Sequence, residues 1–269
     1  MPQYVIDAES RSAALWFDAI RDPNAEYEEG KVTLHLGTYN VICRGRIKRK
    51  NQLVHFSASV EAESMDDCQR IGEEIEELLL DYVSFSAGYT PRIDVVKYAC
   101  RERKEKEIKK RLEHEFICYS PHQAQEIIGF TINRLKTAFA SPQIRNALHY
   151  MRLAEEMQRD PKLRMLLFTK VVEAIIGHAR KKLPWVLSEL GMDEAKDDVQ
   201  SRILNLRNAA DIAHSPNAPE LLHSAFDVTQ NTLIEAHKIV SLMIIKAMKY
   251  IDEGKDLTKL KISYYDKNK

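Results

Sequence analysis

The hydrophobic period of this chain of 269 residues is helical throughout after about residue 115. Before that point, residues 31–36, 40–48 and 53–63 alternate apolar and polar side chains, as half-buried strands do. After it, apolar residues recur at the spacing of an amphipathic helix. The change of period predicts a sheet-containing N-terminal domain and a helical C-terminal part.

The N-terminal part is expected to form an α+β domain over residues 1–117. A short amphipathic helix is predicted for residues 8–22 (AESRSAALWFDAIRD), and three strands follow it. Ser64 is suited to cap a second helix, and a last strand follows Pro91. The predicted order is therefore helix, three strands, helix, strand. Residues 101–115 are mostly charged, which indicates a solvated helical linker at the domain boundary.

The C-terminal part is expected to form an antiparallel all-α bundle over residues 118–254, followed by a polar tail over residues 255–269. Gly and Pro are scarce, at 9 residues each, which favours helices over a sandwich or barrel. The connections between the predicted helices are short, as they are in helical bundles. Five helices are predicted, over residues 123–139, 143–157, 161–182, 197–214 and 218–251.

The charges of the chain balance, because Lys and Arg number 40 and Asp and Glu also number 40. Contact with a nucleic acid would therefore need a local basic patch, or a dimer that brings two patches together. The four cysteines are widely spaced, which argues against a zinc site or a disulfide framework and indicates a cytoplasmic protein with reduced thiols. We expect no metal, no cofactor, no signal peptide and no membrane-spanning segment.

Three residues of the fourth predicted helix suggest a site for phosphate chemistry. Arg207 and Asn208 are adjacent, and five residues separate Asn208 from His214. Residues seven apart on a helix return to nearly the same angle, so Arg207 and His214 share a face. A guanidinium matches phosphate oxygens, and an imidazole exchanges protons near neutral pH. One face that carries both groups suits a reaction at a phosphodiester.

This arrangement resembles the signature of the HEPN superfamily, in which Arg and a polar residue, often Asn, are followed after a short spacer by His. The resemblance covers roughly residues 120–250, and the helix around Glu173 (MLLFTKVVEAIIGHARKK) resembles the family's inner helix. It implies a HEPN-like helical bundle that forms a homodimer, with both motifs in one composite site. Many members are metal-independent endoribonucleases of toxin–antitoxin, anti-phage or CRISPR-associated systems, so an antitoxin or regulatory protein would be a further partner.

The resemblance implies a role for each motif residue. The ribose 2′-hydroxyl would attack the adjacent phosphate and leave a 2′,3′-cyclic end. His214 would move a proton, Arg207 would stabilise the charge on the phosphorane oxygens, and Asn208 would position the phosphate or the partner's Arg. Asp211 and Glu173 are supporting candidates. Glu173 lies among apolar residues, where a buried carboxylate needs a partner such as Arg207, or it is an ordinary boundary residue.

Plainer interpretations of the motif stay open. Arg207 could pair with Asp211 one turn further along the helix, and His214 could be a cation that the helix end favours. A similar set of residues in the second predicted helix has too short a spacing and is expected to be an exposed helix face: Arg145, Asn146 and His149.

A second group of basic residues lies in the predicted strand 40–48. Arg44, Arg46 and Lys48 alternate and so share one face, where they could contact RNA phosphates or protect a solvated sheet edge. The leading hypothesis is a metal-independent endoribonuclease whose N-terminal domain selects substrate or senses a signal. The alternatives are a non-catalytic protein that binds a nucleotide or a protein partner, and a structural helical dimer.

Overall fold

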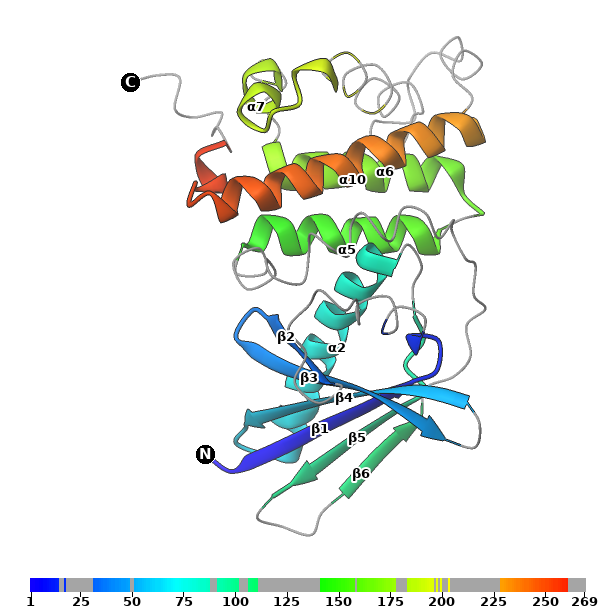
Figure 1. The fold of residues 1–269 in the computed structure, drawn as a ribbon, viewed down its shortest axis with the longest axis vertical. Coiled ribbons are helices and arrows are strands. Elements are labelled where there is room, and N and C mark those ends of the chain that lie inside the picture. Colours follow the sequence, from blue (N-terminus) through cyan, green and yellow to red (C-terminus); the bar gives the residue numbers. More distant parts are fainter. Residues whose placement is uncertain are drawn as a thin grey trace, which may run out of the picture. The chain divides into compact units, whose positions relative to one another are not determined.

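The structure is a computed structural model, and its described residues form two compact units. The units comprise residues 1–140 and 141–269 (Figure 1). The structure describes residues 1–14, 17, 31–48, 51–87, 91–101, 106–110, 141–157, 159–177, 183–195, 197, 199, 203 and 228–260.

An antiparallel sheet dominates the first unit. Its six described strands lie in the order β2-β3-β4-β1-β5-β6, so the first strand of the chain is in the middle of the sheet. Gly37, with a φ of 63°, allows the tight turn between β2 and β3. The strands are β1 (Gln3–Ser10), β2 (Lys31–Leu36), β3 (Tyr39–Lys48), β4 (Asn51–Glu61), β5 (Val95–Cys100) and β6 (Lys106–Lys110).

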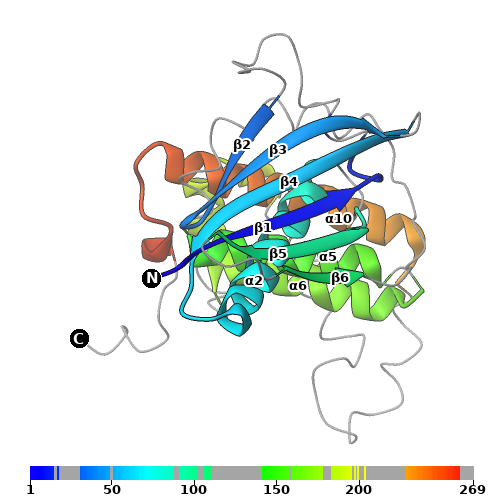
Figure 2. The ribbon, with the colours of Figure 1, turned by 90° about the horizontal axis from the view of Figure 1, so that it is seen from below.

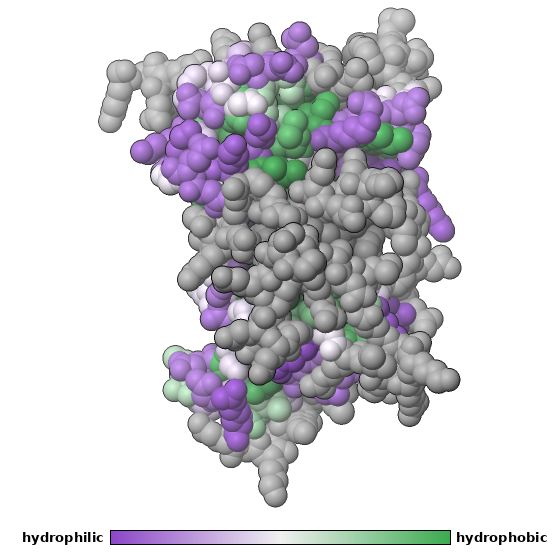
Figure 3. Space-filling model, in the orientation of Figure 1, coloured by the Kyte–Doolittle hydropathy of each residue, from purple (hydrophilic) through white to green (hydrophobic). Residues whose placement is uncertain are grey.

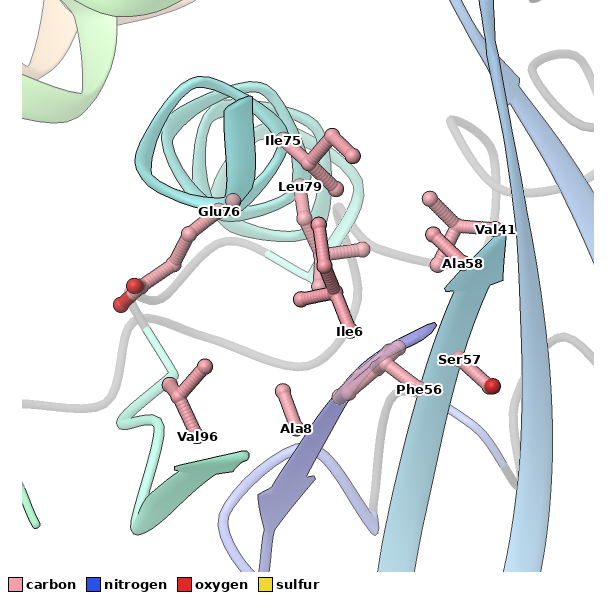
Figure 4. Close-up of a pocket in the computed structure, with 11 residues that line it drawn as sticks. Ile6, Ala8, Val41, Phe56, Ser57, Ala58, Ile75, Glu76, Leu79 and Val96 are labelled. Atoms are coloured by element: carbon pink, nitrogen blue, oxygen red, sulfur yellow. The ribbon is translucent and has the colours of Figure 1, made fainter. Parts of the chain in front are cut away.

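Helix α2 (Met65–Ala87) covers one face of this sheet. The Oγ atom of Ser64 accepts a hydrogen bond of 3.1 Å from the backbone N–H of Asp67, which confirms the predicted cap. The sheet residues below the helix are mostly apolar. A small pocket between helix and sheet is lined mainly by apolar side chains such as Ile6 and Ala58, together with Glu76 of α2 and Ser57 of β4 (Figure 4). The apolar core of this unit therefore lies between α2 and the sheet.

The described elements of the second unit are helical. Helices α5, α6 and α10 pack on one another, and the N-terminus of α6 is capped by Asp160, whose carboxylate accepts from the N–H of Leu163 at 2.9 Å. The elements are α5 (Pro142–Glu156), α6 (Pro161–Ile176), α7 (Leu183–Glu189), α10 (Gln230–Asp252) and two 3-10 turns, η2 (Asp193–Ala195) and η5 (Leu257–Leu260). None of the helices in the described part of the chain has the length and apolar character of a membrane-spanning segment.

The predicted order of elements in the first unit is wrong at both ends. Residues 8–10 were assigned to a helix but continue β1, in which buried and partly exposed side chains alternate. Residues 106–110 were assigned to a helical linker but form β6 at the edge of the sheet. The misreading has a physical cause, since charged side chains are typical of edge strands as well as of solvated helices.

The predicted fold class, an α+β domain followed by an all-α HEPN-like bundle, is also wrong. The first unit contains two strands that the prediction lacked, and the short helix α7 was not predicted in the second unit. The last helix begins at Gln230 behind the cap Thr229, whereas the prediction began it at residue 218. Helix α6 ends at Ile176, where Gly177 adopts a φ of 72°, instead of continuing to residue 182.

The predicted domain boundary and the predicted start of the polar tail can be compared with the structure only in part. The predicted domain boundary between residues 117 and 118 lies outside the described residues, and the two compact units divide between residues 140 and 141. The polar tail was expected to be loose from residue 255, but Leu257 and Leu260 are buried in η5. The apolar spacing of these two leucines is what anchors the first part of the tail.

Candidate functional site

The residues of the predicted phosphate site lie outside the described residues. These are Arg207, Asn208, Asp211 and His214. Their arrangement, including the pairing of Arg207 with Asp211 or with Glu173, stays a prediction.

Two residues at the beginning of the same predicted helix are described. Val199 and Ile203 are both completely buried. Both are described in π-helical conformation, whereas the prediction was an α-helix. Their burial places this described part of the segment in the core.

Glu173 lies in α6 among buried apolar residues, as the sequence indicated. Its carboxylate is 2.8 Å from the ammonium nitrogen of Lys170, one turn earlier in the helix. The Glu173 side chain is 8% exposed and that of Lys170 is 36% exposed, so the ion pair spans the border between core and solvent. Lys170 was not predicted as a partner, although its spacing of three residues from Glu173 is the usual one for helical ion pairs.

The shorter Arg-Asn-His set of the sequence lies on α5. Asn146 is exposed, and Arg145 and His149 are partly exposed, as expected for a solvated face. The ring of His149 lies 3.4 Å from the guanidinium of Arg152. The same guanidinium donates a hydrogen bond of 2.8 Å to the carboxylate of Glu156. These contacts fix the set as part of the polar surface of α5.

A carboxylate–imidazole pair that the sequence analysis missed joins α5 to α10. The Nε2 atom of His237 is 3.3 Å from the Oε1 atom of Glu155, and 82 positions separate the two residues. The Glu155 side chain is 5% exposed and that of His237 is 16% exposed. The imidazole therefore lies at the rim of the core with the carboxylate behind it.

The surroundings of this pair are partly apolar. The ring of Phe168 meets the His237 ring edge-on, with 6.0 Å between centroids. The guanidinium of Arg164 donates to the backbone oxygen of Ala154 and contributes positive charge near Glu155. Burial raises the pKa of Glu155, while the hydrogen bond from His237 and its charge act in the opposite direction.

The pair has the chemistry of a proton-transfer group, because a carboxylate on one ring nitrogen orients an imidazole. The sequence contained a signal for it. Glu155 continues the apolar stripe of Leu148 and Met151, and His237 stands one turn after the buried Leu233. A polar residue in line with a buried stripe needs a partner in the core.

The basic residues of β3 are described in part. Arg44 is exposed and lies opposite Lys31 of β2 and His55 of β4. The backbones of Arg46 and Lys48 continue β3, opposite Leu53 and Asn51 of β4, while their side chains lie outside the description. The backbone register therefore places Arg44, Arg46 and Lys48 at alternate positions of one strand, as the prediction requires.

Cysteines and metal-binding groups were also located. Cys43, Cys68 and Cys100 are free and buried, and burial raises the pKa of the Cys68 thiol to about 11. A thiol with so high a pKa is a poor nucleophile at neutral pH. In the described part of the chain, no group of three or more His, Cys, Asp or Glu side chains is placed to hold a metal ion.

Comparison with known proteins identifies no relative of the chain. No family model, no curated protein and no solved structure matches it.

Proposed function

We propose that this chain is an endoribonuclease that cleaves RNA without a metal ion. The observation that carries the proposal is the order of residues in the sequence, in which Arg207 and Asn208 are followed after five residues by His214. The sequence places a phosphate-binding cation and a proton-transfer group on one helical face. The resemblance of this motif to that of HEPN ribonucleases assigns the reaction class.

The reaction is an internal transfer at one phosphate. The ribose 2′-oxygen bonds to phosphorus, the bond from phosphorus to the 5′-oxygen of the next nucleotide breaks, and the product ends in a 2′,3′-cyclic phosphate. His214 moves the proton between the two oxygens. Arg207 stabilises the charge on the non-bridging oxygens, and Asn208 orients the phosphate.

The proposed enzyme acts as a cytoplasmic homodimer in which two motifs share a site. Apolar side chains on the surface of the helical unit are consistent with a second copy, since Ile234 and Leu242 of α10 are 41% and 43% exposed. Figure 3 shows apolar residues, in green, beside hydrophilic ones, in purple, on one face of the molecule. A toxin or anti-phage role, with an antitoxin or regulatory protein as partner, belongs to the same proposal.

Cleavage of a mixed RNA pool in EDTA tests the proposal. We expect the full chain to cut RNA in EDTA and to leave ends that need removal of a cyclic phosphate before they can be extended. Arg207→Ala and His214→Ala should each slow cleavage by about 10²–10⁴-fold. Arg145→Ala and His149→Ala are matched controls, because they remove the same residue types from the exposed face of α5 and should leave the rate unchanged.

Two results would overturn the mechanism: loss of cleavage in EDTA, or a His214→Ala variant as fast as the parent. If the parent cuts no RNA but its melting temperature rises with added nucleotide, the chain is a nucleotide-binding protein instead.

A further inference from the structure

The sheet of the first unit has one polar face, which is named the open face here. It is the face opposite α2, and no described element of the unit covers it (Figure 2). Along β1, Tyr4, Ile6 and Ala8 are buried under α2, whereas Asp7 and Glu9 of the alternate set are partly exposed. The open face therefore consists of the odd-numbered residues of β1 and the residues in register with them.

Carboxylates in the middle of the open face are already paired. The Nε2 atom of His55 in β4 lies 3.4 Å from the carboxylate of Asp7 in β1. The ammonium nitrogen of Lys97 in β5 lies 3.7 Å from the carboxylate of Glu9. The charge of Lys97 reduces the repulsion that Glu9 would exert on an anion.

Basic residues border the open face on both sides. Arg44 is exposed on β3, and Arg101, which follows β5, is exposed and donates to the Oγ atom of Ser59 at 2.9 Å. The register places further basic positions beside them. The border at β2 and β3 has Lys31, Arg44, Arg46 and Lys48, and the border at β5 and β6 has Lys97, Arg101, Lys106 and Lys110.

By backbone register, eight basic positions fall on this face against three acidic ones, Asp7, Glu9 and Glu61. Among the basic ones, the side chains of Arg44, Lys97 and Arg101 are described. The whole chain has no net charge, so this excess is local. A stable protein partner would need an apolar centre in the interface, but where β1 pairs with β4 only Val5 of the open-face residues is apolar, beside residues such as His55, Ser57 and Asp7. A polar surface with an excess of positive charge matches a nucleic acid better.

The two borders are three strand spacings apart, from β3 to β5, which is about 14 Å. A stacked single strand advances about 3.4 Å per nucleotide, so about four nucleotides span this distance. We propose that the open face binds single-stranded RNA across the strands, with phosphates at the two basic borders and bases over the central strip. The hydroxyl groups of Ser57 and Ser59 offer hydrogen bonds to base edges there.

The choice of RNA as the ligand rests on the proposed ribonuclease function. Binding is therefore measured separately from cleavage, in a variant that should not cut the RNA. The full-length His214→Ala protein is titrated into a short labelled mixed-sequence RNA at KCl concentrations between about 0.1 M and 1 M. The logarithm of the binding constant falls linearly with the logarithm of the salt concentration, and each phosphate contact adds about 0.7 to the steepness of that fall. Arg44→Gln with Arg101→Gln should reduce that slope by about 1.4 and weaken binding at 0.1 M about 25-fold. Lys97 is left intact because its loss would leave Glu9 without its cation.

A control with the same loss of net charge is Arg70→Gln with Lys238→Gln. Both side chains are exposed, and Arg70 is on α2, on the other side of the sheet, whereas Lys238 belongs to the helical unit. It should bind like the His214→Ala parent. The proposal fails if the parent does not bind the RNA, if both double variants lose affinity equally, or if the Arg44 and Arg101 variant binds like the parent. Equal or tighter binding of duplex RNA would overturn the single-stranded ligand. Arg44→Gln alone, with an intermediate slope, repeats the test if the double variant does not fold.

Discussion

Replacing His237 by alanine should destabilise the helical unit by about 3 kcal/mol near pH 8. The carboxylate of Glu155 is buried and receives a hydrogen bond from His237 through Oε1, while Oε2 has no hydrogen-bond partner among the described residues. Loss of the donor leaves a buried acceptor without its hydrogen bond, at a cost of about 1–3 kcal/mol, and the upper end applies because bonds to a charged acceptor are the stronger ones. Water can enter at the rim, where His237 lies, and this limits the cost.

The cost should depend on pH in a defined direction. Burial raises the pKa of Glu155 above its ordinary value of 4.5, and His237 partly opposes this rise. A carboxyl group with a raised folded pKa contributes its stability below the unfolded pKa and loses that contribution as the pH rises through the folded pKa. Without His237 the folded pKa is higher still, so His237→Ala is most costly near pH 8 and least costly near pH 4.5.

Urea unfolding can be restricted to this unit by fluorescence. The chain has two tryptophans, so Trp16→Phe leaves Trp185 of α7 as the reporter. His237→Gln keeps an N–H donor and should recover part of the loss. Replacement of both Glu155 and His237 by leucine should recover most of it, because an apolar pair needs no hydrogen bond. A loss below about 1 kcal/mol at both pH values, or a double variant as unstable as His237→Ala, would refute the reasoning.

Three further outcomes are expected. Asp160→Ala should lower the unfolding free energy by about 1 kcal/mol, because it removes the side-chain acceptor for the Leu163 N–H. Ser141→Ala is the control, because Ser141 precedes α5 and its side chain makes no such capping bond. Equal urea midpoints for the two variants would contradict this prediction. Gly72→Ala should cost about 1–3 kcal/mol, since its Cβ would lie 2.5 Å from the buried Tyr98 ring, and an unchanged melting temperature would show that the ring shifts freely. Light scattering should give the mass of a dimer, and a monomer at tens of micromolar would exclude the shared site.

Local signals in the sequence determined several elements of this protein by themselves. The alternation over residues 31–36 predicted β2, and the structure has it at Lys31–Leu36. Ser64 caps α2 and Pro161 begins α6, as predicted. The depth of Glu173 among apolar residues was also visible. These features depend on residues a few positions apart, so period and capping chemistry suffice to locate them.

Tertiary structure alone decided the features that depend on distant partners. Residues 3–10 become a central strand only because β4 and β5 pair with both of their edges, and the charged residues 106–110 become a strand because β5 offers them an edge. The Glu155–His237 pair and the two basic borders of the open face arise in the same way, from strands and helices that meet across long stretches of chain. Hydrogen-bond register and the burial of a charge depend on what the rest of the fold places opposite a residue, and a local sequence pattern does not contain that information.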